Sequence, residues 1–268
     1  MSGFTLTLRQ AMGLRLDLRG IKPSALAALD AAAVERLPIG CGNRLLPLGE
    51  CFGVAPRGDD RLVLEGDLSR CDRIGWQLDG GTMLAGGSVG HYAGGAMTAG
   101  TLTVQGSADL LAGCEMAGGT LDIHGSVGDF AASTLPGSMD GMRGGLLLVR
   151  GDAGARFADR MRRGSALVFG DAGDFLASRL VAGTVALAGR PGAHPGHGLR
   201  RGSLVLLTDA APPPTWVPAV GAAPVAWQLL ARDLQRHGGP FAGLARRGHE
   251  RHLGDVAAGG KGEWIAVR

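Results

Sequence analysis

GTMLAGGSVGHYAGGAMTAGTLTVQGSADLLAGCEMAGG, residues 81–119, contains two copies of one glycine pattern. The copies begin at glycines 19 residues apart. Outward from this stretch the pattern continues to Gly202, with one longer gap of 26 residues between Gly119 and Gly145. One unit reads G-x5-G-x2-G-x3-[GA]-x5-G, and its leading glycines are Gly81, Gly100, Gly119, Gly145, Gly164, Gly183 and Gly202. A fixed period of this kind indicates a repeat architecture.

Each unit carries a short strand after its leading glycine. Apolar residues alternate there, as in Leu102 and Val104 or Leu121 and Ile123, which is typical of a half-buried strand. A unit of 19 residues is too short for the helical pair of an α-solenoid, and its internal spacing does not fit a strict hexapeptide period. The sequence therefore predicts an all-β solenoid, a right-handed parallel β-helix of ~19-residue coils, with at least seven coils over about residues 62–208.

A Leu or Met residue stands three positions before every leading glycine. A row of methionines can suggest a soft-metal site. However, a position that recurs in each coil of a solenoid faces the core, and methionine fills cores well. We therefore expect one continuous buried row, made of Leu78, Met97, Met116, Met142, Met161, Leu180 and Leu199.

The pattern divides the chain into three parts: a capping segment over residues 1–60, the β-helix over 61–208, and a helix and tail over 209–268. The segments Phe4–Arg9 and Leu14–Arg19 alternate as strands, and Pro23–Arg36 has the pattern of a helix. A segment of this kind would cover the open end of a solenoid, where unpaired strand edges otherwise promote aggregation.

The C-terminal part begins with a helix expected over Ala222–His237, and the remaining tail, Gly238–Arg268, is loop-like. Seven extra residues within Ser133–Gly144 should bulge from one face of the stack. After this insertion, one outer face of the strands turns apolar, with Leu148, Leu167, Phe169, Val205 and Leu207. So large an apolar patch indicates a contact. We expect either the Ala222–His237 helix, through Trp227, Leu230 and Leu234, or a partner protein to cover it, and we favour the helix.

Composition narrows the classes of protein. Glycine numbers 48 of 268 residues, and the net charge is only +3, which predicts neither nucleic-acid nor membrane binding. Lys22 and Lys261 are the only lysines, a bias that suggests a GC-rich genome. The cysteines form no CxxC pair, which argues against iron–sulfur and zinc sites. We expect reduced, mostly buried thiols in a cytoplasmic, soluble protein, and no apolar run is long enough to cross a membrane.

Two histidine pairs have ligand-like spacing, His194 with His197 and His249 with His252, but a metal site would need further fixed ligands. We interpret them as loop or partner-facing side chains. A polar row follows the second glycine of each unit, and turn formation explains it better than catalysis: Ser88, Ser107, Ser126, Asp152 and Asp171. No clustered acids mark a polysaccharide-cleaving site. We therefore expect this chain to contain no catalytic, cofactor-binding or metal-binding residues.

The glycine ladder resembles the repeat in the C subunit of formylmethanofuran dehydrogenase, a β-helix shared with the large subunit of glutamate synthase. The resemblance rests on Gly87-x2-Gly90-x3-Gly94, Gly106 to Gly113, Gly151-x2-Gly154-x3-Ala158 and Gly170-x2-Gly173-x3-Ala177. It covers the whole layout of the chain. The ending is also similar, at Gly254-Asp255 and at Gly259-Gly260-Lys261-Gly262-Glu263. The whole-chain layout favours the C-subunit family over the synthase domain.

The resemblance implies a place in one of two complexes. One is a molybdenum or tungsten formylmethanofuran dehydrogenase of methanogenic archaea. The other is the formyltransferase/hydrolase complex of methylotrophic bacteria, which moves a formyl group from tetrahydromethanopterin to a methanofuran-type cofactor and releases formate. The implied partners are amidohydrolase-like, molybdopterin-enzyme-like and formyltransferase subunits, which carry the chemistry, while this chain acts as a scaffold. The arginine-rich, alanine-rich composition favours the bacterial complex.

Two other classes stay open at this point. A stand-alone β-helix hydrolase or lyase would be active when expressed alone. A glutamate-synthase-like protein would purify with a flavin and iron–sulfur protein.

Overall fold

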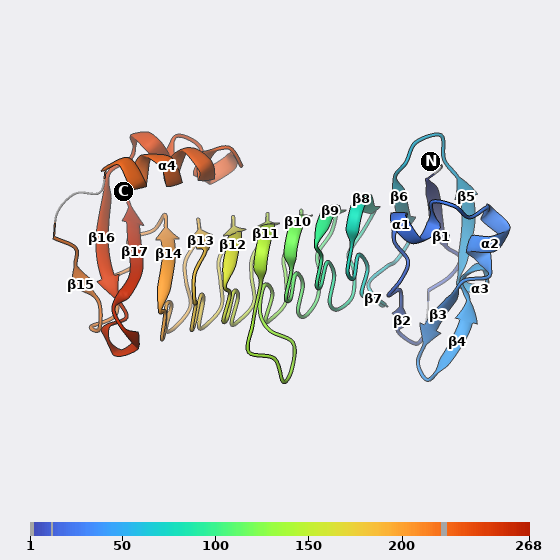
Figure 1. The fold of residues 1–268 in the computed structure, drawn as a ribbon, viewed down its shortest axis with the longest axis horizontal. Coiled ribbons are helices and arrows are strands. Elements are labelled where there is room, and N and C mark those ends of the chain that lie inside the picture. The colour runs from blue at the N-terminus through green and yellow to red at the C-terminus, as the bar shows by residue number, and fades with distance from the viewer. Residues whose placement is uncertain (1–2, 12, 221–223) are drawn as a thin grey trace.

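The main element is a sheet of 13 strands that runs along most of the molecule (Figure 1). The computed structural model describes residues 3–11, 13–220 and 224–268. The strand order of this sheet is β15 (Val217–Pro218), β16 (His249–Gly254), β17 (Lys261–Val267), β14 (Arg201–Leu206), β13 (Thr184–Leu187), β12 (Arg163–Val168), β11 (Arg143–Val149), β10 (Ala117–Ile123), β9 (Ala99–Val104), β8 (Asp79–Ala85), β6 (Leu62–Glu65), β1 (Phe4–Leu8) and β5 (Phe52–Pro56). The chain is thus mostly β, with a long, largely parallel sheet and few helices, which fits a β-helix-like fold.

Strands β8 to β14 pair parallel in chain order, as the glycine pattern predicted. Leu121 of β10 pairs with Leu102 on one side and with Leu147 on the other. The same register continues to Leu204 of β14, which pairs with Trp264 of β17. A second row of parallel bridges joins Val89, Ala108, Val127, Ala153, Ala172 and Pro191. The chain therefore returns to the same lateral position after each strand.

The predicted Leu and Met row is confirmed as core. Each of its seven members, from Leu78 to Leu199, is 0% exposed. They belong to one apolar cluster with the inward side chains of the strands, such as Leu121 and Leu147. Enclosure of this kind supplies most of the favourable free energy of folding in a stack of short strands.

The glycines of the repeat fulfil two different structural needs. All seven leading glycines have positive φ, between 75° and 105°, a conformation that side chains strain. Gly106, a second glycine of the pattern, is required for space, because a Cβ there would lie 2.4 Å from the backbone nitrogen of Ser88. Positive φ therefore explains the leading glycines, while close approach of backbones explains Gly106.

The N-terminal segment forms the end of the main sheet and a second sheet. Strand β1 pairs parallel with β6 and antiparallel with β5. The second sheet has the order β4 (Arg44–Pro47), β3 (Pro38–Cys41), β2 (Leu16–Asp17) and β7 (Cys71–Asp72). Both lie at the end of the stack opposite to the C-terminus (Figure 1). Together they adjoin the edge that a solenoid would otherwise leave open.

The single helix predicted over Pro23–Arg36 is wrong. The structure has two short helices, α1 (Pro23–Leu26) and α2 (Ala31–Glu35), and a third, α3 (Leu48–Cys51), follows β4. Asp30 interrupts the first segment because its backbone is extended and its side chain accepts a 2.7 Å hydrogen bond from Ala33 N. Aspartate at this position starts a new helix instead of continuing the old one.

The loop predicted over Gly238–Arg268 is also wrong. After two short 3-10 turns at Gly239–Phe241 and Leu244–Arg246, the tail supplies β16 and β17, with a third 3-10 turn at Val256–Ala258 between them. Strand β17 pairs parallel with β14 and so extends the stack. Its residues do not alternate because both faces are buried, with Trp264 in the main core and Ile265 beneath the C-terminal helix. The signal of a half-buried strand was therefore missing from the sequence.

The apolar outer face is covered by the chain's own C-terminal helix, as we favoured. Helix α4 spans Pro224–Gln235, while residues 222 and 223 of the predicted segment lie outside the described part. Leu148, Leu167 and Val205 of the strands form a second buried cluster with Trp227 and Leu234 of α4. Phe169, Leu207 and Leu230 pack at the edge of this cluster.

The insertion within Ser133–Gly144 leaves the stack as a loop between β10 and β11 (Figure 1). No helix among the described residues is long and apolar enough to cross a membrane.

Candidate functional site

The polar row that follows the second glycine of each unit forms hydrogen bonds within the stack. The Oγ of Ser88 accepts a 3.0 Å bond from Ser107 N, and the Oδ1 of Asp152 accepts a 2.8 Å bond from Asp171 N. The same contact recurs from Ser107 to Ser126, from Ser126 to Asp152 and from Asp171 to Arg190. Each of these side chains accepts a hydrogen bond from a backbone N–H at the equivalent corner of the next repeat unit. Stabilisation of the turns therefore explains the polar row.

Asp159 is a more enclosed carboxylate, only 2% exposed. It accepts a hydrogen bond from Ser178 Oγ, and Arg179 donates to both of its oxygens at 3.0 and 2.7 Å. A general acid or base needs a free lone pair or a proton directed at a substrate. Because its oxygens are already occupied by charged and hydroxyl donors, Asp159 has the environment of a structural ion pair.

His194 and His197 lie around one aromatic ring. The ring centres of Phe175 and His194 are 5.1 Å apart, and those of Phe175 and His197 are 6.0 Å apart. Both histidines are exposed, at a corner where His194 has a φ of 57°. Their contacts are therefore aromatic, and they extend the surface formed by Phe175.

His249 and His252 are separated by their strand. Both lie in β16, where side chains three residues apart point to opposite faces. His249 stacks on Trp227 with ring centres 4.5 Å apart, and His252 pairs in register with Trp264. Burial, together with the nearby Arg251, lowers the pKa of His249. The two imidazoles cannot jointly ligate one metal from this strand, despite their spacing in sequence.

The four cysteines, Cys41, Cys51, Cys71 and Cys114, are free and buried. Burial raises the pKa of the Cys71 thiol and of the Cys114 thiol to about 12. A thiol in this state is neutral at physiological pH and a poor nucleophile. These side chains act as small apolar core residues.

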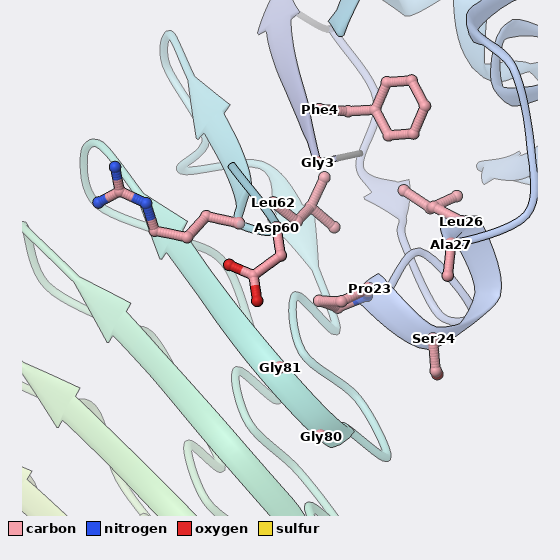
Figure 2. A pocket seen from close by; sticks show the side chains of 11 residues that line it. Gly3, Phe4, Pro23, Ser24, Leu26, Ala27, Asp60, Leu62, Gly80 and Gly81 are labelled. Atoms are coloured by element: carbon pink, nitrogen blue, oxygen red, sulfur yellow. The ribbon is translucent and has the colours of Figure 1, made fainter. Parts of the chain in front are cut away.

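A pocket that the sequence did not reveal lies where the N-terminal segment meets the stack (Figure 2). Phe4 of β1, Leu26 of α1 and Leu62 of β6 line it, with Pro23 and Gly81 at its lower side, around a cavity of about 220 Å³. These residues come from four separate segments, so no local pattern marks them. The lining suits an apolar group.

The described residues bring none of the candidate groups into a catalytic constellation. Within residues 3–11, 13–220 and 224–268, no group of three or more His, Cys, Asp and Glu side chains is placed to hold a metal ion. The side chains of the polar row and of Asp159 form hydrogen bonds to neighbouring residues of the stack, and the histidine pairs contact aromatic rings. The arrangement instead consists of a long sheet with an apolar outer face beneath α4 and a row of polar side chains along its corners.

A solved structure is similar to the chain over nearly its full length. It is the X-ray crystal structure of the formyltransferase/hydrolase complex (FhcABCD) from Methylorubrum extorquens in complex with methylofuran. The TM-score is 0.90, the sequence identity is 40%, and the match covers 98% of this chain and 98% of that chain.

Curated sequences give shorter matches. The chain is 42% identical over 86 residues to the C subunit of the formyltransferase/hydrolase complex Fhc of Methylorubrum extorquens, which is 32% of each protein. It is 33% identical over 90 residues to the C subunit of molybdenum-containing formylmethanofuran dehydrogenase 1 of Methanothermobacter thermautotrophicus, covering 33% of this chain and 22% of that protein. The chain thus spans a third or less of the length of these curated relatives in the matched regions. None of the family profiles compared with the sequence matches it.

Proposed function

Because this chain belongs to the C-subunit family of formyltransferase/hydrolase and formylmethanofuran dehydrogenase complexes, we propose that it is a non-catalytic scaffold subunit of a formyltransferase/hydrolase complex. The observation that carries the proposal is the similarity to a chain of the FhcABCD crystal structure, which spans 98% of both chains at 40% identity. An equally complete match would not arise from a shared repeat alone, because the capping segment and the C-terminal helix are included.

The proposed complex transfers a formyl group from tetrahydromethanopterin to a methanofuran-type carrier and releases formate. Its amidohydrolase-like, molybdopterin-enzyme-like and formyltransferase subunits carry this chemistry. The solved complex contains methylofuran, which agrees with a carrier of that class. The side chains of the polar row and of Asp159 are used in hydrogen bonds within the fold, which supports a structural role for this chain. The free, buried thiols support a reducing compartment such as the cytoplasm.

A dehydrogenase of the archaeal type is the second candidate, supported by the 33% identity to the C subunit of the molybdenum enzyme. In the sequence comparison the bacterial C subunit matches 32% of the chain at 42% identity, the archaeal one matches 33% at 33% identity, and the solved bacterial complex matches 98% of the chain in structure. The bacterial complex is therefore the better candidate.

We also propose that the stack is a right-handed β-helix of ~19-residue coils between residues 61 and 208, with a cap over 1–60 and a helical cover over 209–268. The pairing of Leu102 with Leu121 and the hydrogen bond from Ser107 N to Ser88 support this coil length, since each joins residues 19 apart. Right-handedness follows the usual sense of crossover between parallel strands.

The test is purification of the tagged chain from its native host, with mass-spectrometric identification of the chains that co-elute. We expect amidohydrolase-like, molybdopterin-enzyme-like and formyltransferase subunits together, and formyl transfer only in the assembled complex. Recovery with a molybdenum or tungsten cofactor would support the dehydrogenase instead. Formyl transfer or glycan cleavage by the chain alone would overturn the scaffold role.

A further inference from the structure

A hollow at the edge where the later strands begin is lined by arginines. Arg143 of β11, Arg162 and Arg163 at the start of β12, and Arg201 of β14 surround a space of about 350 Å³. We call these four residues the basic hollow. Val181 and Ala182 also line it, and its one acidic lining residue is Asp140 of the insertion.

The register of the strands places like charges directly opposite each other. Arg143 pairs in register with Arg163, and Arg201 pairs in register with Lys261 of β17. Neighbouring strands lie about 4.8 Å apart, and like charges directly opposite destabilise a sheet. The strand pairing alone therefore gives no stabilising reason for placing Arg143 opposite Arg163 or Arg201 opposite Lys261.

Few carboxylates neutralise these cations. Arg162 Nε lies 2.5 Å from Asp140 Oδ1, and Arg143 Nη2 lies 3.9 Å from Glu115 Oε2. In the described part of the chain, Arg163, Arg201 and Lys261 have no carboxylate within 4.0 Å. All of these basic residues are exposed. The hollow therefore holds an excess of positive charge at the surface.

The equivalent edge at the other end of the stack lacks this excess. The strands there begin with Asp79 in β8, Ala99 in β9 and Ala117 in β10, and none of these residues is basic. Asp79 is already paired with Lys22, at 2.8 Å. The positive charge is thus confined to the half of the stack that follows the insertion, on an edge that α4 does not cover.

We propose that the basic hollow docks a carboxylate-rich surface segment of a partner subunit in the complex, an inference that rests on the proposed function. Guanidinium groups bind carboxylates through two parallel hydrogen bonds, which lysine does not provide. Four strands at about 4.8 Å spacing present a row roughly 15 Å long. This length matches a few acidic side chains on one helix or strand, and it is too short for the extended backbone tracking of nucleic acids.

The experiment is co-expression of the full complex with either the wild-type chain or Arg163→Glu/Arg201→Glu. The dissociation constant of this subunit from the remaining subunits is then measured at several NaCl concentrations. Arg232→Glu is the matched control, because Arg232 is an exposed arginine on α4 without an ion pair in the described residues. We expect the double variant to bind at least about tenfold more weakly at low salt and to lose part of its salt dependence. The control should bind like the wild type.

Circular dichroism melting of each variant shows whether folding is intact, and Arg163→Gln/Arg201→Gln provides a variant without reversed charge. Wild-type affinity and salt dependence in both double variants would overturn the inference. So would normal assembly of these variants with impaired formyl transfer, because the hollow would then serve a small anionic ligand. Failure of the wild-type chain to assemble would overturn the proposed function itself, so the two failures are distinguishable.

Discussion

Arg150, which directly follows β11, and Asp122 of β10 form a bidentate ion pair. Arg150 Nε lies 3.0 Å from Asp122 Oδ1, and Nη2 lies 2.9 Å from Oδ2. The same guanidinium sits 4.5 Å above the centre of the Phe169 ring and donates a 3.3 Å bond to the carbonyl of His237. The pair therefore stands at the border where the polar outer face of the first coils meets the apolar face covered by α4.

Replacement of Arg150 by alanine should lower the free energy of unfolding by about 1–3 kcal/mol, because it leaves a half-buried carboxylate without its partner and removes the contact to Phe169. Urea unfolding measures the change, and a double-mutant cycle with Asp122→Asn isolates the pair. Arg232→Ala on the exposed side of α4 is the control. Equal effects of the two alanine variants would contradict this role.

Leu167→Asp should destabilise the chain by at least about 3 kcal/mol, because Leu167 is 0% exposed beneath α4 and the new carboxylate would be buried without a partner. The matched control is Leu229→Asp on α4 itself, where the side chain is 63% exposed. We expect that variant to stay within about 0.5 kcal/mol of the wild type. Thermal melting compares the two. Similar melting temperatures would show that α4 does not hold this face closed in solution.

Met116→Ala should cost about 2–5 kcal/mol, because Met116 is fully enclosed in the Leu and Met row. Met139 in the insertion is the same residue type at 66% exposure, so Met139→Ala should be almost neutral. Chemical unfolding of both variants measures the difference. A small effect at Met116 would mean that the row relaxes around the gap.

The repeat was predictable because each coil imposes the same steric demand at the same position. Leading glycines such as Gly100, at a φ of 78°, recur at 19-residue intervals except across the insertion. Met116 and its equivalents mark the core with the same spacing. The covering of Leu167 was predictable from an apolar side chain at an outward position. These features are local in sequence once the period is known.

The ends were less predictable because their structure depends on contacts distant in sequence. Strand β17 has no alternation, since Trp264 and Ile265 are buried on opposite faces by different elements. The pocket around Phe4 and the basic hollow each collect residues from several segments. For the hollow a signal was present, in Arg143, Arg163 and Arg201 one or two positions before leading glycines, but these residues form a cluster only when the strands are stacked.

Gly106→Ala should prevent close stacking of two neighbouring coils. A Cβ at Gly106 would lie 2.4 Å from Ser88 N and 2.7 Å from the carbonyl carbon of Gly87, so backbone has to move. We expect a loss of at least about 2 kcal/mol, typical of forced overpacking. Gly58→Ala is the control, because a Cβ there has no atom within 4 Å. Unfolding in urea gives both values, and a Gly106→Ala variant as stable as the control would show that the coils can separate freely.

His249 should make the stability of the chain depend on pH in one direction. Burial beside Trp227, with Arg251 nearby, lowers the pKa of the folded-state imidazole below its ordinary value of 6.5. The unfolded chain therefore binds the proton first, so stability is fully present above about pH 6.5 and falls as the pH drops toward the lowered pKa. Melting temperatures at pH 7.5, 6.5 and 5.5, chosen around that value, measure the decline. His249→Gln should reduce it without abolishing it, because burial also lowers the pKa of His237. A variant whose melting temperature falls as steeply as that of the wild type would assign the decline to other groups.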